Sequence, residues 1–335
     1  IDGNAHGVCF VVDGEGKLAG GITDGDVRRA LLAGKGLNAS AQDVMVANFF
    51  SLPADSSSAL IQNNLSERIR VIPLLNPEGI PVDFATRSRY HRISVLEPNL
   101  KGNELAYVTD CIQTNWISSQ GSYVRRFEED LRNYAGANYA LAVSNGTVAL
   151  HLALKALGIG PGDEVIVPSL TFAASANAVI HAGATPVFAD VEAETWTIDV
   201  AAARKLIGPR TKAIMPVHLY GHPCRMDELQ DLVNSHDIQL VEDCAESLGS
   251  LYKGRQTGSF GAAACFSFFG NKTITTGEGG MVLFRDLSCF EMGAVLRDHG
   301  MSKKERYWHD VVGFNYRLTN MQAAIGVAQM ERVDQ

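Results

Sequence analysis

Cys265-Phe-Ser-Phe-Phe-Gly-Asn-Lys-Thr-Ile-Thr-Thr-Gly-Glu-Gly-Gly280 runs from an apolar segment into a turn rich in glycine and threonine. The apolar residues 262–269 predict a buried strand, which would deliver Ser267 and then Lys272 to its carboxyl end. Burial disfavours the charged form of a lysine, and the neutral amine attacks carbonyl carbon to form a Schiff base. Lys272 is therefore a candidate catalytic residue, with an ordinary surface lysine after a strand as the alternative.

The composition is that of a globular protein. The 335 residues favour two domains of roughly 100–200 residues each, and 46% of them are hydrophobic and 20% charged. The net charge of -8 argues against a nucleic-acid partner, which would favour a basic protein. No apolar run reaches the roughly 20 residues of a membrane span, and no secretory signal opens the sequence. We therefore expect a cytoplasmic protein with neither a nucleic-acid nor a membrane partner.

The cysteines predict the redox state of the protein, and the chain ends indicate whether the sequence is whole. Six cysteines are scattered without CxxC or zinc spacing, which predicts free thiols in a reducing compartment and no metal site. The sequence begins at Ile1 without a methionine, and it ends at Gln335 within a helical pattern, 320–333, that has no stop signal. We interpret the chain as a fragment of a longer protein.

Helix and strand patterns alternate from residue 93 to residue 335. Such alternation with short loops predicts an α/β fold, a mostly parallel sheet covered by helices. Binding sites in such sheets lie at the carboxyl ends of the strands. The predicted strands are 139–143, 164–167, 186–189, 213–217 and 238–241, and the predicted helices are 123–134, 148–157, 173–181, 200–207 and 226–233.

Three strand ends carry residues that could bind a ligand or take part in catalysis. Ser144-Asn-Gly-Thr147 lies between a strand and a helix, where free N–H groups favour a phosphate; an ordinary helix cap is the alternative. Glu242-Asp-Cys-Ala-Glu246 follows the strand that ends at Val241. A carboxylate there would suit the cationic ring nitrogen of pyridoxal phosphate, whereas the alternative is an acidic helix start. Ser267 and Lys272 form the third strand end, so the order along the chain is phosphate turn, carboxylate and lysine.

Residues 93–335 resemble the DegT/DnrJ/EryC1/StrS family of pyridoxal-phosphate sugar aminotransferases, which has the fold of aspartate aminotransferase (fold type I). The motifs that carry the resemblance are Thr114-Asn-Trp-Ile-Ser-Ser119, Val143-Ser-Asn-Gly-Thr-Val-Ala-Leu-His-Leu152, Gly160-Pro-Gly-Asp-Glu-Val-Ile-Val-Pro168, Val217-His-Leu-Tyr-Gly-His-Pro223, Glu242-Asp-Cys-Ala-Glu-Ser-Leu-Gly249, the Lys272 segment and Tyr307-Trp-His-Asp-Val-Val-Gly-Phe-Asn-Tyr-Arg317. Members of this family continue into a smaller C-terminal domain that closes over the active site, and this chain stops before it.

The resemblance implies roles for matching positions. Lys272 would hold pyridoxal 5′-phosphate covalently and then move protons between the cofactor and the sugar, and Asp243 would pair with the pyridine nitrogen. The other cofactor contacts would be Phe172 on the ring, Gly146, Thr147 and Ser267 at the phosphate, Glu246 near the ring hydroxyl or the sugar, and Asn315 at the phosphate of the neighbouring subunit in a homodimer. Trp116, Ser118 and His309 would face the substrate, with loop packing as the alternative for His309.

The resemblance also implies a reaction in which glutamate donates its amino group to a nucleotide-linked 4-keto-6-deoxyhexose. The expected substrate is GDP-4-keto-6-deoxymannose, which would become GDP-perosamine for a surface polysaccharide. The alternatives are 4-keto or 3-keto sugars linked to UDP or dTDP. A related dehydrase branch replaces the lysine with histidine, and Lys272 argues against it. A protein of a different class, a catalytically dead nucleotide sensor, would be at odds with the intact set of Asp243, Ser267 and Lys272.

Residues 1–92 show a loose repeat and are expected to form a separate α+β domain. The segments Gly20-Gly-Ile-Thr-Asp-Gly-Asp-Val-Arg-Arg-Ala-Leu31 and Asp43-Val-Met45 resemble a pair of CBS modules whose first module lacks its start. This resemblance implies that Thr23 and Asp26 hold the phosphate and ribose of a regulatory nucleotide. The matching segment 80–86 lacks such a pair, so we expect one nucleotide site, and a packing module that binds nothing is the alternative.

Overall fold

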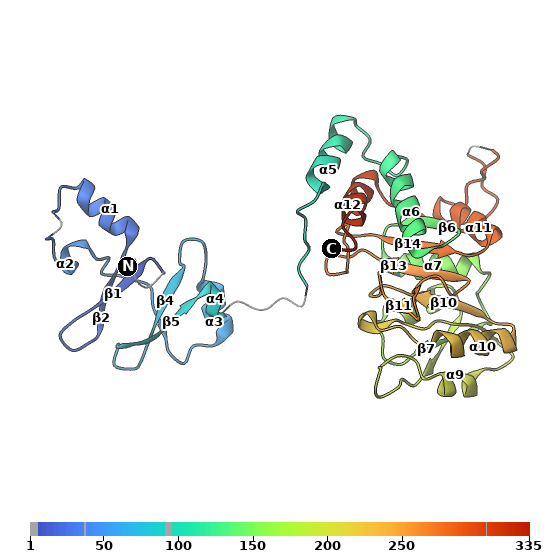
Figure 1. Ribbon diagram of the computed structural model, residues 1–335, viewed down its shortest axis with the longest axis horizontal. Coiled ribbons are helices and arrows are strands. Elements are labelled where there is room, and N and C mark those ends of the chain that lie inside the picture. Colours follow the sequence, from blue (N-terminus) through green and yellow to red (C-terminus); the bar gives the residue numbers. More distant parts are fainter. Residues whose placement is uncertain (1–5, 37, 91–95, 306) are drawn as a thin grey trace. The chain divides into compact units, whose positions relative to one another are not determined.

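A computed structural model describes residues 6–36, 38–90, 96–305 and 307–335. The chain divides into two compact units, Ile1–Val95 and Leu96–Gln335 (Figure 1). The domain boundary expected between residues 92 and 93 lies outside the described residues. Among the described residues, no helix has both the length and the apolar character needed to cross a membrane.

The first unit contains the same ββα arrangement twice. In each copy an antiparallel hairpin leads into a helix, and the hairpins share one register, with Val8 opposite Thr23 and Val71 opposite Thr86. The offset between the copies is therefore 71 − 8 = 86 − 23 = 63 residues. The first copy is β1 (Val8–Val12), β2 (Leu18–Thr23) and α1 (Asp24–Leu32), and the second is β4 (Val71–Leu75), β5 (Pro81–Thr86) and α4 (Arg87–Tyr90).

Short elements connect the two copies and complete a small core. Strand β3 pairs with β4 in parallel, and a buried cluster lies under the second hairpin. The connecting elements are α2 (Ala41–Val44), β3 (Leu52–Pro53) and α3 (Ser58–Asn64), and the cluster consists of Ile61, Ile72, Leu74 and Ala85.

The second unit is built on a seven-stranded sheet with the order β6-β14-β13-β10-β9-β7-β8 (Figure 1). The pairings from β13 through β10, β9 and β7 to β8 are parallel, whereas β14 is antiparallel to both of its neighbours. The predicted mostly parallel sheet is therefore confirmed, with one antiparallel strand that the alternation did not predict. The strands are β6 (Tyr139–Val143), β7 (Glu164–Pro168), β8 (Thr185–Ala189), β9 (Thr211–Ile214), β10 (Gln239–Asp243), β13 (Ala263–Ser267) and β14 (Gly280–Phe284).

Alternate side chains of each strand belong to different apolar clusters, one on each face of the sheet. Ala263 and Cys265 of β13 pack with α7, whereas Ala264 and Phe266 pack with α6 and α12. Successive side chains of a strand point to opposite faces, so each face is closed by its own helices. The helices are α5 (Glu104–Gln113), α6 (Ser122–Ala135), α7 (Gly146–Ala156), α8 (Ala174–His181), α9 (Val200–Leu206), α10 (Met226–His236), α11 (Leu287–Arg297) and α12 (Asn320–Met330).

Local signals set the helix ends beside the sheet. The Asn145 side chain accepts a hydrogen bond from the Val148 N–H at 3.0 Å and starts α7 directly after β6. Gly136 ends α6 with a positive φ of 69°, a conformation that glycine adopts without strain. Because β6, β10 and β13 run in the same direction, their carboxyl ends, Val143, Asp243 and Ser267, lie along one edge of the sheet.

Candidate active site

The turn before α7 and the end of β13 form a small polar cradle. A Cβ atom on Gly146 would lie 2.7 Å from the Cβ and 2.9 Å from the Oγ of Ser267, so only glycine fits there. The first N–H groups of a helix have no acceptor within the helix, and those of Gly146 and Thr147 belong to this set. The structure thus brings together Gly146, Thr147 and Ser267, whose donors suit a phosphate group.

Asp243 ends β10 as a buried carboxylate, 4% exposed. Its Oδ2 accepts a hydrogen bond from the Ser175 hydroxyl at 2.8 Å, and its Oδ1 accepts one from the Ala245 N–H at 3.1 Å. Burial raises the pKa of Asp243, and the bonds from Ser175 and Ala245 and the charge of Lys272 act in the opposite direction. A carboxylate has about four acceptor positions, so these two bonds leave room for a cationic partner.

Phe172 lies one helical turn before the serine that holds Asp243. The Ser175 N–H donates to the carbonyl oxygen of Phe172 at 3.2 Å, while the Ser175 hydroxyl donates to Asp243. Phe172 is 78% exposed, although aromatic residues usually lose most of their exposure on folding. Its face is therefore available to a planar group near Asp243.

Lys272 lies in the turn after β13 and pairs with Glu246. The Lys272 Nζ is 3.2 Å from the Glu246 Oε1, and the two side chains are 20% and 31% exposed. The second oxygen of Glu246 accepts a hydrogen bond from the Tyr220 N–H at 2.8 Å. The acidic helix start considered for 242–246 is wrong, because β10 runs through Asp243 and the chain then enters turns.

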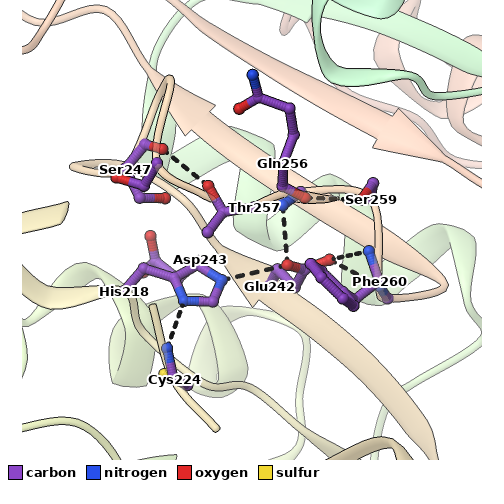
Figure 2. A network of polar contacts seen from close by, with 12 residues as sticks. His218, Cys224, Glu242, Asp243, Ser247, Gln256, Thr257, Ser259 and Phe260 are labelled. Atoms are coloured by element: carbon purple, nitrogen blue, oxygen red, sulfur yellow. Dashed lines mark hydrogen bonds and ion pairs between the residues drawn. The ribbon is translucent and has the colours of Figure 1, made fainter. Parts of the chain in front are cut away.

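Glu242, the neighbour of Asp243, faces the opposite side of β10 and is completely buried (Figure 2). Its Oε1 accepts from the Phe260 and Gly261 N–H groups at 2.8 and 2.7 Å. Its Oε2 accepts from the Gly258 N–H at 2.8 Å and contacts the His218 Nε2 at 3.2 Å. Four donors thus fill the four acceptor positions of this carboxylate. The sequence interpretation gave Glu242 no role of its own, although strand alternation separates it from Asp243.

His218, Glu242 and Cys244 bring three potential metal-ligand atoms within 4.8 Å of one another. Both oxygens of Glu242 are already occupied by N–H donors. Burial raises the pKa of Cys244 to about 12, which favours the neutral thiol. We interpret this cluster as a hydrogen-bonded network.

Asn315 lies in a segment that pairs with the end of β6, since the Ser144 N–H donates to the Tyr316 carbonyl at 2.9 Å. The rings of Phe314 and Tyr316 stack on each other and contact His151 of α7. Asn315 points the other way and accepts from an Arg317 N–H at 3.1 Å. Asn315 itself is exposed.

The three candidate substrate residues lie on exposed loops. The carbonyl oxygens of Trp116 and Ser118 accept hydrogen bonds from Asn320 at 2.7 and 3.1 Å, which ties their loop to the start of α12. The His309 Nδ1 lies 2.9 Å from the His299 carbonyl oxygen. These contacts hold the backbone of the loops and leave Trp116 55% exposed.

In the first unit, Thr23 and Asp26 lie together but bond to each other. The Thr23 N–H and hydroxyl donate to the Asp26 Oδ2 at 2.8 and 2.6 Å, and the Asp26 N–H donates back to the hydroxyl at 3.3 Å. The pair forms a capping box at the start of α1, and Arg29 forms an ion pair with Asp26. In the second copy the Thr86 hydroxyl accepts from the Arg89 N–H at 3.3 Å, and Arg89 has no carboxylate to complete a capping box.

The model of the DegT/DnrJ/EryC1/StrS aminotransferase family matches residues 98–335. The chain belongs to this family. Two relatives named GDP-perosamine synthase are 55% identical over 244 residues, in Caulobacter vibrioides, and 52% identical over 242 residues, in Escherichia coli O157:H7. These alignments cover 73% and 72% of this chain and 66% of each relative, so the chain spans slightly under two thirds of the relatives it matches.

Solved structures of aminotransferases share the fold of the second unit. Spr1654 from Streptococcus pneumoniae, solved in its PLP form, is 30% identical with a TM-score of 0.69, over 73% of this chain and 67% of that chain. The cofactor expected from the sequence, pyridoxal 5′-phosphate, is thus the cofactor of this family. The described residues fit it, because a phosphate cradle, an exposed aromatic ring and a buried carboxylate with open acceptor positions lie at one sheet edge.

Proposed function

We propose that the protein transfers an amino group from glutamate to the keto carbon of a nucleotide-linked sugar, with pyridoxal 5′-phosphate as cofactor. The observation that carries the proposal is the joint placement of Asp243, Lys272 and the Gly146–Ser267 cradle in a chain of an aminotransferase family. The same set argues against a catalytically dead nucleotide sensor.

The residues divide the work of holding the cofactor. Asp243 would keep the pyridine nitrogen protonated, Phe172 would cover the ring, and Ser267 with the Gly146 and Thr147 N–H groups would bind the phosphate. When bound, the cofactor supplies an electron sink for negative charge at the reacting carbon. Lys272 Nζ would carry the proton to and from that carbon, and such positioned groups typically contribute about 10²- to 10⁴-fold in rate.

The substrate that we propose is GDP-4-keto-6-deoxymannose, with GDP-perosamine as the product. Support comes from the relatives named GDP-perosamine synthase, which are 55% and 52% identical to this chain. UDP- and dTDP-linked 4-keto or 3-keto sugars are the competing substrates. A panel of these sugars with glutamate would rank them by kcat/KM, and a preference for a UDP or dTDP sugar would overturn the choice of GDP.

We further propose a homodimer, which is supported by the exposed position of Asn315. In this arrangement Asn315 would reach the phosphate held by the neighbouring subunit, and Trp116, Ser118 and His309 would line the sugar site. The free cysteines fit a reducing cytoplasm. Asn315→Ala should weaken cofactor retention, and an active monomer in sedimentation would contradict the shared site.

For the first unit we propose a CBS-like module that binds one regulatory nucleotide at Thr23 and Asp26. The 63-residue repeat and the equivalent caps at Thr23 and Thr86 support a duplicated module. The residue three positions after the threonine is Asp26 in the first copy and Arg89 in the second, which supports one site rather than two.

The decisive experiment identifies the lysine that holds the cofactor. The purified protein should absorb in the visible, and borohydride should fix the cofactor to Lys272. Lys272→Ala should bind the cofactor without fixing it and lose turnover by about 10²- to 10⁴-fold. Lys253→Ala is the matched control, because Lys253 is exposed and paired with Asp227. Fixation at another lysine would refute the proposal.

A further inference from the structure

The segment 216–222 contacts both Asp243 and the Glu246–Lys272 pair of the candidate active site. Its Pro216 carbonyl accepts from the Asp243 N–H at 2.9 Å, and the His218 N–H donates to the Asp243 carbonyl at 3.1 Å. Two residues after His218, the Tyr220 N–H donates to the Glu246 carboxylate at 2.8 Å, and Glu246 pairs with Lys272. A shift of this one segment would therefore move the carboxylate and the lysine together.

The side chain of His218 fixes this segment from the inside of the protein (Figure 2). Its Nδ1 accepts a hydrogen bond from the Cys224 N–H at 3.1 Å, so the ring proton lies on Nε2. Nε2 then donates to the Glu242 Oε2 at 3.2 Å. Both side chains are completely buried, which leaves no water to replace a broken bond.

Glu242 connects the same histidine to a second loop. Its remaining three acceptor positions bind the N–H groups of Gly258, Phe260 and Gly261. The 258–261 loop therefore holds the Glu242 carboxylate in place, and the carboxylate in turn holds the His218 ring. Because the ring is held, the backbone of 216–222 is held as well.

The turn that follows His218 contains two residues with left-handed backbone. Tyr220 has a φ of +50°, a left-handed conformation that disfavours residues with a Cβ. Gly221 has a φ of +82°, and a Cβ on it would lie 3.2 Å from the Glu246 carbonyl oxygen. The Glu246 carboxylate and the segment anchored by His218 hold this turn on its two sides.

We propose that His218, through its buried bond to Glu242, is a positioning residue that sets the placement of Asp243 and of the Glu246–Lys272 pair. The inference rests on the proposed function, since it concerns how the cofactor and the reacting lysine are held. His218 touches neither cofactor nor substrate in this scheme and acts through the backbone of 216–222.

Two substitutions separate the two bonds of the imidazole in the cofactor-loaded protein. His218→Gln places an amide N–H near the former Nε2 and retains the bond to Glu242. His218→Asn places a carbonyl near the former Nδ1 and retains the bond from Cys224 but not the bond to Glu242. The Asn variant should lose roughly 10- to 100-fold in kcat with little change in sugar KM, as small misplacements of reacting groups do. The Gln variant should recover most of that loss.

The circular dichroism of the bound cofactor gives a readout that is independent of turnover. It should change in His218→Asn and return toward the wild-type spectrum in His218→Gln. Asp199→Ala is the matched control, because Asp199 caps α9 and its loss weakens a helix that carries none of the site residues. That variant should lose stability and keep the wild-type spectrum and kcat.

The outcomes distinguish the inference from the function on which it rests. If the wild-type protein binds no cofactor at Lys272, the proposed function fails. If it does, unchanged dichroism and kcat in folded His218→Asn would overturn the positioning role. Should His218→Asn not fold, Gly221→Ala displaces the same turn directly. A changed spectrum in that variant supports the proposal, and an unchanged spectrum overturns it.

Discussion

Glu242 and Asp243 are neighbours on β10, and their carboxylates face opposite sides of the sheet edge. Both are buried, but Glu242 receives four hydrogen-bond donors and Asp243 only two. Hydrogen bonds at all four positions offset the cost of burying a carboxylate, whereas open positions leave part of that cost until a cation binds. Burial does not distinguish the two residues. The number of hydrogen-bond donors does: it is complete around Glu242, which has a structural role, and incomplete around Asp243, which would bind the cofactor.

The strongest test of this comparison is Asp243→Asn. The amide still accepts from Ser175, so the fold should persist, while the pyridine nitrogen would lose its anionic partner. We expect kcat to fall by about 10²- to 10⁴-fold, the range for positioned acid–base groups. Steady-state kinetics on the cofactor-loaded protein measure it. Turnover close to that of the wild type would mean that Asp243 only ends the strand.

Glu242→Gln tests the other side of the comparison. The side-chain amide would place a donor against N–H groups that now have an acceptor, such as those of Gly258 and His218. Loss of a buried, fully bonded charge should lower the free energy of unfolding by about 3–5 kcal/mol. Urea unfolding without cofactor measures it. Glu246→Gln, at a partly exposed carboxylate, is the control and should lose much less. A loss equal to that of the control would remove the distinction.

The pH dependence of stability tests the Asp243 part of the comparison. Burial raises the pKa of Asp243 above its ordinary value of 3.8 in the folded protein. Its stabilising contribution is therefore fully present below pH 3.8 and is lost as the pH rises through the folded pKa. Without cofactor, Asp243→Asn should be more stable than the wild type near pH 7 and should lose that advantage toward pH 4. An advantage that is constant across this range would contradict the assignment.

The first unit offers the smallest test, because Asp26 is already engaged by Thr23 and Arg29. We expect weak binding of an adenine or guanine nucleotide, and a coupling to the transferase of about 1–3 kcal/mol. Calorimetry on the whole protein should lose the heat in the double variant Thr23→Ala, Asp26→Ala. Thr86→Ala is the control, since it removes about 1 kcal/mol of helix capping in the other copy. No heat with any nucleotide would leave a packing module.

Local patterns account for the parts of the molecule that the sequence predicts well. Apolar runs such as 164–167 and 238–241 become strands β7 and β10, and the strand before Lys272 becomes β13. Each of these depends on burial of a short continuous segment, which a sequence displays directly.

The remainder depends on contacts between distant segments. Strand β14 lies antiparallel between β13 and β6, and no local signal distinguishes this pairing from a parallel one. The roles of His218 and Glu242 depend on loop N–H groups brought in from 224 and 258–261. The pairing of Lys272 with Glu246 and of Asp243 with Ser175 likewise appears only when the sheet assembles.

The antiparallel strand β14 has a consequence for the order of events during synthesis. Gly280 lies opposite Val143, 280 − 143 = 137 residues earlier, and a Cβ on Gly280 would lie 2.5 Å from the Asn145 carbonyl oxygen. The loop that carries Lys272 thus leaves the phosphate cradle at Ser267 and returns to the same turn at Gly280. Long-range pairings of this kind close slowly. The strand that joins the two sides of the cradle, β14, is synthesised after both of them, so the sheet between β6 and β13 closes last.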